Sequence, residues 1–172
     1  MAIRLNLACG VNLRDGWVNV DLLREGVEVE RVDLTKPWPW ADESVDEVYC
    51  EHFLEHLEPT EARFFMEEAY RVLAHDGILS IGVPDCGLIM LEYVEGKNLH
   101  EYIPKRLWSV PTMDQIQWWF RQNGNHKWGY DERSLGSLFK RHGFTCSVRE
   151  WQEGRDSRVR KYETLYMDGV KP

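Results

Sequence analysis

Small residues and carboxylates follow apolar runs at three places near the start of the sequence. The run Leu5–Leu7 leads into the small residues Ala8–Gly10, and two later runs end at Asp21 and Asp33. Small residues let a backbone approach a ligand closely, and a carboxylate at a strand end can accept hydrogen bonds from both hydroxyls of a ribose. Because parallel strands end at the same edge of a sheet, the pattern predicts a nucleoside-binding site at that edge.

Seven segments have the apolar or alternating patterns of β-strands. They are Ile3–Ala8, Trp17–Asp21, Val27–Asp33, Val45–Cys50, Gly77–Val83, Phe144–Trp151 and Glu163–Met167. Between the fourth and fifth segments, apolar residues recur every three or four positions from Ala62 to Leu73, and Pro59 suits a first helical turn. The spacing predicts a helix that crosses over between two parallel strands.

A later helix is predicted, and an earlier one is expected to be missing. Asp131 is a candidate N-cap, and Gly143 stands where a left-handed residue would end the helix. Only ten residues, Val11–Val20, separate Gly10 from Asp21, which is too few for a helix and a strand of usual length. We therefore expect a loop in place of the first helix.

The length of 172 residues, 43% of them apolar, predicts a single domain over residues 1–172. Within it, the segment 86–128 is expected to form a substrate-side lid insertion. Thr112 and Gln115 have capping-box spacing, which predicts a short helix ending at Arg121. The lid segment also holds four tryptophans that would stack on an aromatic, sugar or cationic acceptor, or pack in the core: Trp108, Trp118, Trp119 and Trp128. Farther on, Glu153–Lys161 has the composition of a charged hairpin loop.

The charge balance limits the classes of partner. The formal net charge is -8, with 21 Lys and Arg against 29 Asp and Glu, which disfavours nucleic acid because phosphate contacts are made mainly by clustered cations. Four scattered cysteines, with no C-x-x-C pair and no secretory leader, indicate a reduced, cytoplasmic protein. No apolar run approaches the roughly 20 residues that span a bilayer. We expect a small-molecule acceptor as partner, and a homodimer stays open.

The strand ends belong to a set of motifs that occur in a fixed order along the chain. They are Leu5–Gly10, Gly16–Asp21, Asp33-Leu34, Phe53–His56, Tyr70–Leu73 with Asp76-Gly77, and Pro84-Asp85. Together they resemble the class I S-adenosylmethionine-dependent methyltransferases, and more narrowly the short bacterial predicted methyltransferases with a reduced first helix. The resemblance covers about residues 3–146. It implies an α/β, Rossmann-like, three-layer sandwich with a seven-stranded, mostly parallel sheet, flanking helices and a reversed last hairpin.

The resemblance implies S-adenosylmethionine as cofactor, with S-adenosylhomocysteine as product. Asp21 would bind the ribose, and Asp33 the adenine amino group, with Leu34 beside the ring. Asn6 stands where the family usually has an acidic residue. A G-x-G-x-x-G motif is missing, which disfavours a dehydrogenase. The predicted cofactor-binding residues are Asn6, Ala8, Cys9, Gly10, Asp21, Leu22, Asp33, Leu34, Glu51 and His52.

Methyl transfer from a sulfonium requires mainly that the acceptor is aligned with the carbon–sulfur bond and that water is excluded. His52 and His126 are the candidate catalytic residues, because a neutral imidazole can accept a proton near pH 7. Asp85, after the fifth strand, is a further site candidate or otherwise part of a turn. The predicted function is direct in-line methyl transfer to a small-molecule acceptor, such as a saccharide or an aromatic compound. The first alternative is a non-catalytic protein of the same fold that binds the adenosyl cofactor or a partner.

The segment His52–His56 supports two further alternatives. It matches the H-x-x-E-H motif of inverted zinc peptidases, which would make a zinc hydrolase that uses His52, Glu55 and His56. Leu54–His56, with the later His126, is also similar to the metal-binding E-x-x-E-H motif and later histidine of some class I O-methyltransferases, although His52 stands where that pattern has Glu. A divalent metal is therefore left open without being favoured. If no metal binds, Glu55 and His56 cap or brace the crossover between the fourth and fifth predicted strands.

Overall fold

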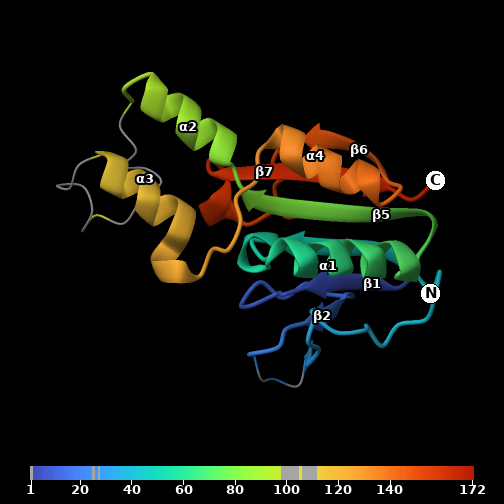
Figure 1. The fold of residues 1–172 in the computed structure, drawn as a ribbon. Coiled ribbons are helices and arrows are strands. Elements are labelled where there is room, and N and C mark those ends of the chain that lie inside the picture. Colours follow the sequence, from blue (N-terminus) through green and yellow to red (C-terminus); the bar gives the residue numbers. More distant parts are fainter. Residues whose placement is uncertain (1, 25, 27, 98–104, 106–111) are drawn as a thin grey trace.

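Seven strands form one mixed sheet in the part of the chain that the structure describes. The computed structural model describes residues 2–24, 26, 28–97, 105 and 112–172. The strands are β1 (Arg4–Leu7), β2 (Val18–Val20), β3 (Val29–Glu30), β4 (Val45–Glu51), β5 (Leu73–Pro84), β6 (Thr145–Arg149) and β7 (Thr164–Val170). Their order is β3-β2-β1-β4-β5-β7-β6, and β7 runs antiparallel to both of its neighbours (Figure 1). The predicted Rossmann-like sheet with a reversed last hairpin is confirmed.

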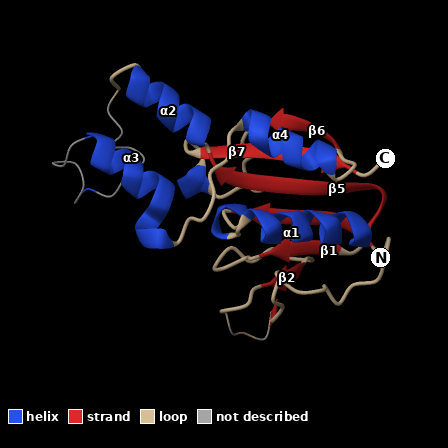
Figure 2. Ribbon diagram, viewed as in Figure 1, coloured by secondary structure: helices blue, strands red, loops and turns tan. Residues whose placement is uncertain are grey.

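Helices cover one face of the sheet and extend beyond one end of it. Helices α1 (Pro59–Val72) and α4 (Glu132–Arg141) pack on the same face (Figure 2). Helices α2 (Cys86–Val94) and α3 (Thr112–Arg121) lie beyond the carboxyl end of β5, and the lid function of this segment stays a prediction. Trp108 and Val27 fall outside the described residues. The short 3-10 turns are η1 (Leu54–His56), η3 (Gln122–Gly124) and η4 (Arg158–Arg160).

None of the helices within the described ranges is long and apolar enough to cross a membrane.

The helices α1 and α4 begin where their capping residues predict. Pro59 opens α1, where Glu58 and Glu61 form a reciprocal capping box. Asp131 caps α4: its carboxylate accepts the Ser134 N–H at 2.8 Å, and the Asp131 N–H donates to the Ser134 hydroxyl at 2.9 Å. Both helix starts therefore satisfy amide groups that would otherwise lack partners.

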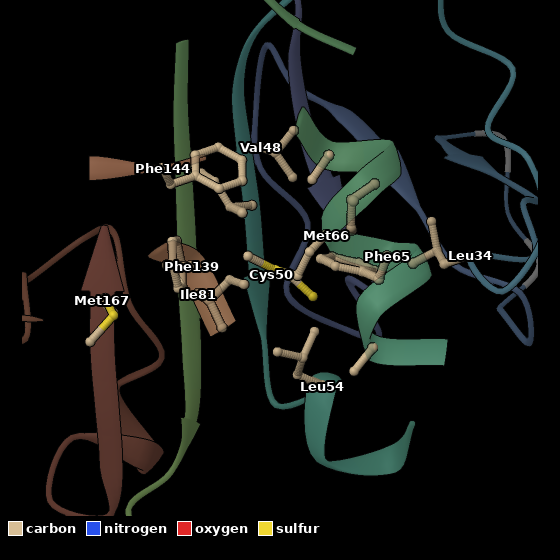
Figure 3. Close-up of a cluster of buried hydrophobic side chains, with 14 of the residues drawn as sticks. Leu34, Val48, Cys50, Leu54, Phe65, Met66, Ile81, Phe139, Phe144 and Met167 are labelled. Atoms are coloured by element: carbon tan, nitrogen blue, oxygen red, sulfur yellow. The ribbon is translucent and has the colours of Figure 1, made fainter. Parts of the chain in front are cut away.

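The main core lies between the sheet and these two helices (Figure 3). Phe65 of α1 is fully buried and meets Trp38 edge to face, with ring centroids 5.1 Å apart. Phe139 of α4 packs in the same way against Phe144, at 5.7 Å. Burial of each such side chain contributes about 1.5–3 kcal/mol, so this one face carries most of the apolar stabilisation. Along each strand, every second side chain points into this core. These core residues of the strands include Leu5, Leu7, Val48, Cys50, Leu79 and Ile81.

Helix α2 is an element that the sequence analysis missed. Asp85, expected in a site or a turn, caps this helix by accepting the Leu88 N–H at 3.0 Å. The helix is apolar on most sides, with Ile89 buried but Met90 and Val94 exposed at 58% and 81%. A one-sided apolar stripe is the usual sign of a surface helix, and the sequence of α2 has none. Ile89 packs instead in a small second cluster with Ile116 and Trp119 of α3.

The connection from β1 to β2 contains no helix among its described residues, as predicted. Two buried asparagines organise the loop that replaces it. Asn6 Nδ2 donates to the Asn12 carbonyl and to Asn19 Oδ1, both at 2.8 Å. Asn19 Oδ1 also accepts the Arg14 N–H at 2.9 Å. An acidic side chain at position 6 has no N–H to donate, which explains why this chain has Asn6 there.

Replacing Asn6 by aspartate is expected to lower the free energy of unfolding by at least about 1–3 kcal/mol. Asn6 is 2% exposed, and the variant would place a carboxylate against the Asn12 carbonyl and Asn19 Oδ1 with no hydrogen to share. Urea unfolding at neutral pH measures the change. Asn12→Asp, at an exposed side chain of the same loop, is the matched control and should unfold like the wild type. Equal stability of the two variants would contradict this account of the loop.

The face of the sheet opposite α1 and α4 is polar, and loops rather than helices cover it in the described residues. On β4, Tyr49 and Glu51 alternate with the core residues Val48 and Cys50 and so point to this face. The Arg14 guanidinium stacks over the Tyr49 ring at 3.5 Å from its centroid. The third layer of the predicted sandwich therefore consists of the segment 8–17 and of residues 150–163, which connect β6 to β7.

Candidate functional site

A cavity of about 890 Å³ opens at the carboxyl ends of β1 and β4. This size is within the range of small-molecule sites in proteins. Three parts of the chain form its wall: the end of β1 with the following loop, the end of β4, and the segment 154–160. The lining residues are Asn6–Arg14, Tyr49, Glu51, His52 and Gly154–Arg160. Of the predicted cofactor-binding residues, this wall contains Asn6, Ala8, Cys9, Gly10, Glu51 and His52.

The loop after β1 makes a tight turn at the residues predicted to approach a cofactor. Ala8 and Gly10 have φ of 51° and 50°, in the left-handed region that disfavours a residue with a Cβ. The Gly10 N–H donates to Asp21 Oδ2 at 3.0 Å, and Asp21 Oδ1 accepts the Leu23 N–H at 2.8 Å. The carboxylate at the end of β2 therefore holds the turn after β1 in place, so two separately predicted features meet in one contact.

The remaining predicted cofactor residues lie outside the cavity wall. Asp33 accepts the hydroxyl of Thr35 at 2.7 Å and its N–H at 3.0 Å, and these bonds lower the pKa of the Asp33 carboxyl. Leu34 is 4% exposed and belongs to the core, whereas Leu22 is 41% exposed. Asp33 thus stabilises its own turn, and Leu34 packs in the main core. Their contacts with an adenine ring stay a prediction.

A buried ion-pair network fixes the segment 154–160 against the sheet. Asp156 accepts from Arg149 Nη2 at 2.7 Å, from the Gln152 N–H at 2.7 Å and from the Tyr49 hydroxyl at 3.1 Å. Arg149 also contacts Asp168 of β7 at 3.0 Å. Burial raises the pKa of Asp156, but the hydrogen bonds from Arg149 and its other partners outweigh burial, and the net shift is downward.

Glu51 connects this segment to the end of β4. Its carboxylate accepts the Tyr166 hydroxyl at 2.6 Å and the Ser157 N–H at 3.2 Å, and Arg160 lies 3.8 Å from its second oxygen. The segment 154–160 is consequently a fixed wall of the cavity. The cavity also contains Arg14, Tyr49 and this segment, which the sequence pattern did not predict there. The two-residue spacing of Tyr49 and Glu51 along β4 is a signal that could have identified Tyr49.

His52 stands where β4 ends and the cavity begins. Its φ of 55° is unusual for a residue with a side chain. Nε2 is 2.7 Å from the Thr164 hydroxyl, and Nδ1 is 3.5 Å from Glu55 Oε1. Burial, with the nearby Arg160, lowers the pKa of His52 to about 2. The imidazole is therefore neutral at pH 7 and is held between Thr164 and Glu55.

A second group of titratable residues lies behind His52. Glu55 is 1% exposed, and neither of its carboxylate oxygens has a hydrogen-bond partner. His56 Nε2 lies 3.7 Å from Glu55 Oε1, and the rings of His56 and His126 meet edge to face at 5.1 Å. Burial raises the pKa of Glu55 to about 8, and burial together with His56 lowers that of His126 to about 4. His126 is thus paired with His56 and Glu55, and it is not among the residues of the large cavity.

The local structure contradicts the zinc-hydrolase alternative. An H-x-x-E-H site needs one long helix that presents both histidines on one face. Here Leu54–His56 forms a single 3-10 turn, and His52 precedes it with a left-handed backbone. The His52 ring bonds Thr164, and it is His126 that joins Glu55 and His56. The motif match at His52–His56 is therefore not a peptidase site.

The wild-type protein in a chelator-containing buffer is expected to lose stability as the pH rises from about 7 to about 8. The pKa of Glu55 is near 4.5 unfolded and about 8 folded, so the folded state binds the extra proton between these values. Stability from this group is complete below pH 4.5 and is lost as the pH rises toward 8. The pKa of His52 and of His126 is lowered by folding, so above about pH 7 these two histidines add little slope.

Urea unfolding of the wild type and of Glu55→Gln across this range tests the expectation. The variant should show a flatter profile, and Glu67→Gln, at an exposed position of α1, should follow the wild type. Parallel profiles for all three proteins would show that Glu55 does not titrate as stated.

Comparisons with known proteins agree with this geometry. Residues 7–81 match a family model described as a methyltransferase domain, and no curated protein sequence matches the chain. A solved S-adenosylmethionine-dependent methyltransferase from Archaeoglobus fulgidus is 15% identical, with a TM-score of 0.65 over 99% of this chain and 86% of that one. The magnesium protoporphyrin IX methyltransferase of Synechocystis PCC 6803, solved with bound S-adenosylhomocysteine, is 14% identical, with a TM-score of 0.57 over 99% and 74%.

A Thermotoga maritima protein described as a possible histamine N-methyltransferase is also 14% identical, with a TM-score of 0.60 over 100% of this chain and 83% of that one. At these identities the likeness shows a shared fold, and the acceptors of these proteins carry no information about the acceptor here.

Proposed function

We propose that this chain is a class I S-adenosylmethionine-dependent methyltransferase that transfers a methyl group to a small molecule bound beside His52; the methyltransferase domain model at residues 7–81 and the shared fold support this. One observation carries the proposal: the 890 Å³ cavity opens at the carboxyl ends of β1 and β4, where open α/β sheets bind their ligands. The cavity volume exceeds what a single cofactor fragment needs, and so leaves room for an acceptor.

The cofactor is proposed to lie across the strand ends. Its methionine part would follow the turn at Ala8–Gly10, which lines the cavity and has positive φ angles at Ala8 and Gly10. Its ribose would meet Asp21, and its adenine would extend toward Leu22 and Asp33 outside the cavity. This path passes the predicted residues after β1, β2 and β3 in the order in which these strands lie in the sheet, whereas Glu51 and His52 stand at the end of β4, on the other side of β1.

The protein's part in the reaction is proposed to be alignment and water exclusion. S-adenosylmethionine supplies an activated methyl group, and the fixed wall formed by residues 154–160 would hold the acceptor in line with it. His52 lines the cavity, and its two ring nitrogens face Thr164 and Glu55, so the neutral imidazole, whose pKa is about 2, would position the acceptor by contact. The proton released by an acceptor hydroxyl would leave to solvent water. The lining is mixed, and its polar side chains, among them Tyr49, Glu51 and Arg160, favour a hydroxyl-bearing acceptor such as a saccharide or a phenol.

Calorimetric titration with S-adenosylhomocysteine tests the proposal first. We expect one equivalent to bind with micromolar affinity, and NAD, as a control with a pyrophosphate, to give no heat of binding. A positive result is followed by acceptor screening with S-adenosylmethionine, in which His52→Ala should lower turnover more than cofactor affinity. If the folded protein does not bind S-adenosylhomocysteine, the proposal is refuted. Cofactor binding without turnover on a broad panel of saccharides and phenols would favour the non-catalytic alternative.

A further inference from the structure

Three potential metal ligands from two distant segments converge behind the cavity. Glu55 and His56 belong to the 3-10 turn after β4, and His126 precedes α4. One ligand atom from each lies within 4.8 Å of the other two. We propose that Glu55, His56 and His126 bind one first-row divalent metal ion such as Zn²⁺ or Co²⁺. This inference does not depend on the proposed function, because it concerns a separate group of side chains.

The strongest argument is the unpartnered carboxylate of Glu55. Its side chain is 2% exposed, yet neither oxygen makes a hydrogen bond. Buried polar groups are almost always paired, because burying a carboxylate without a partner costs several kcal/mol. Two imidazole nitrogens face Glu55 Oε1, His52 Nδ1 at 3.5 Å and His56 Nε2 at 3.7 Å. A cation between Glu55 and His56 would satisfy the oxygens that the protein itself leaves without partners.

The two imidazoles are oriented as metal ligands usually are. His56 Nδ1 is 3.0 Å from the Asn125 carbonyl, so the proton sits on Nδ1 and the lone pair of Nε2 faces Glu55. His126 likewise makes a hydrogen bond with the backbone of Trp119. A ring N–H bonded to a backbone carbonyl is the common support of a metal-bound histidine, because it fixes both the tautomer and the ring plane.

Backbone hydrogen bonds bring the two segments together without a metal. The Glu55 carbonyl accepts the Lys127 N–H at 2.7 Å and the Trp128 N–H at 3.1 Å. His126 is thereby held beside Glu55 although 71 positions of sequence separate them. Ligands of a tetrahedral ion with bonds of about 2.1 Å lie roughly 3.4 Å apart. Glu55 Oε1 and His56 Nε2 are 3.7 Å apart, and the three ligand atoms lie within 4.8 Å of one another, so side-chain rotations would bring them to a common ion.

The arrangement leaves one coordination position for another ligand. His52 is no ligand here, because its Nε2 is engaged by the Thr164 hydroxyl at 2.7 Å. Three protein ligands are typical of metal sites that keep an open position, whereas structural zinc sites have four. The gap beside Glu55 and His126, lined by Trp119, Phe120 and Tyr130 as well, is too narrow for a water molecule in this structure, so a further ligand requires side chains to move. Two nitrogen donors among three ligands favour Zn²⁺ or Co²⁺ over Mg²⁺ or Ca²⁺.

The test is titration of the chelator-stripped full-length protein with Co²⁺ and Zn²⁺, followed by calorimetry and, for Co²⁺, by visible absorption. We expect one equivalent of either ion and no saturable binding of Mg²⁺. Glu55→Gln, His56→Gln and His126→Ala should each weaken binding more than the roughly 10–100-fold typical of losing a supporting residue. His75→Ala, at an exposed histidine beside Asp76, is the matched control and should bind like the wild type.

Binding of less than one equivalent, or equal affinity in all five proteins, would overturn the metal proposal. S-adenosylhomocysteine is titrated into the same preparations. Cofactor binding in a variant shows that it is folded, and cofactor binding without metal binding in the wild type refutes the metal site while leaving the proposed function standing. Metal binding without cofactor binding supports the metal site and refutes the proposed function.

Discussion

Asp156→Ala is expected to lower the free energy of unfolding by about 3–5 kcal/mol, because it leaves a buried guanidinium without its main partner. The Asp156 side chain is 0% exposed and that of Arg149 is 9% exposed. The substitution also removes the acceptor for the Tyr49 hydroxyl and for the Gln152 N–H. These groups join β4, β6 and the segment 154–160, so a single carboxylate holds three parts of the polar face together.

Urea unfolding at pH 7 measures the Asp156 effect. The hydrogen bonds from Arg149 and its neighbours outweigh burial and lower the pKa of Asp156 on folding, so its stabilisation is present above pH 3.8 and is lost as the pH falls further. The difference between wild type and variant should therefore shrink below about pH 4. Arg158→Ala is the control, because Arg158 and Glu153 form an ion pair in the same loop with side chains 83% and 75% exposed. Its unfolding midpoint should stay close to that of the wild type. If Asp156→Ala unfolds like Arg158→Ala, the network is not what holds this segment.

Asp21→Ala is expected to weaken S-adenosylhomocysteine binding by at least about 100-fold. On the proposed function, the carboxylate accepts both ribose hydroxyls, and hydrogen bonds to a charged group contribute about 1.5–3 kcal/mol each. The variant also frees the Gly10 N–H, which Asp21 accepts at 3.0 Å, and so loosens the turn that faces the methionine part. Both effects act in the same direction.

Calorimetry on the folded variant tests the Asp21 prediction. Asp15→Ala removes an exposed carboxylate from the same loop and should leave the affinity unchanged. Asp21→Asn keeps one acceptor oxygen and should lie between the two. Wild-type affinity in Asp21→Ala would mean that the ribose binds elsewhere, and that Asp21 serves only to hold the turn after β1.

The sequence was informative where local chemistry decides the structure. The helix starts at Pro59 and Asp131, the missing first helix and all seven strands follow from spacing, capping and chain length, which act over a few residues. The strand ends also predicted much of the cavity wall, because β1 and β4 end beside each other wherever a parallel sheet has this order. Asp21 was predicted for its carboxylate, and the structure adds that this carboxylate anchors Gly10.

Contacts between residues that are far apart in the sequence could not be predicted from local spacing. The spacing of Gly154–Arg160 gives no sign that this segment reaches across the polar face of the sheet to β4. Tyr49 is far from Asp156 and Arg149 in the sequence, and the three residues come together only in the folded chain. The composition of Glu153–Lys161 predicted a charged hairpin loop, whereas the side chain of Asp156 is fully buried. Likewise His126 joins Glu55 through backbone contacts of residues 127 and 128, which no motif spacing encodes.

The wall of the cavity joins residues that leave the ribosome at very different times. Arg14 donates to the Arg155 carbonyl across 141 positions of sequence. At about 5–20 residues per second, translation needs roughly 7–30 s to advance from Arg14 to Arg155. During this interval β1, β2 and β4 can pair, but β7, which pairs with β5 along its length, has not been made. The nascent chain therefore exposes an unpaired strand edge and a half-built pocket, so ligand binding reports that the residues through β7 have been made and have folded.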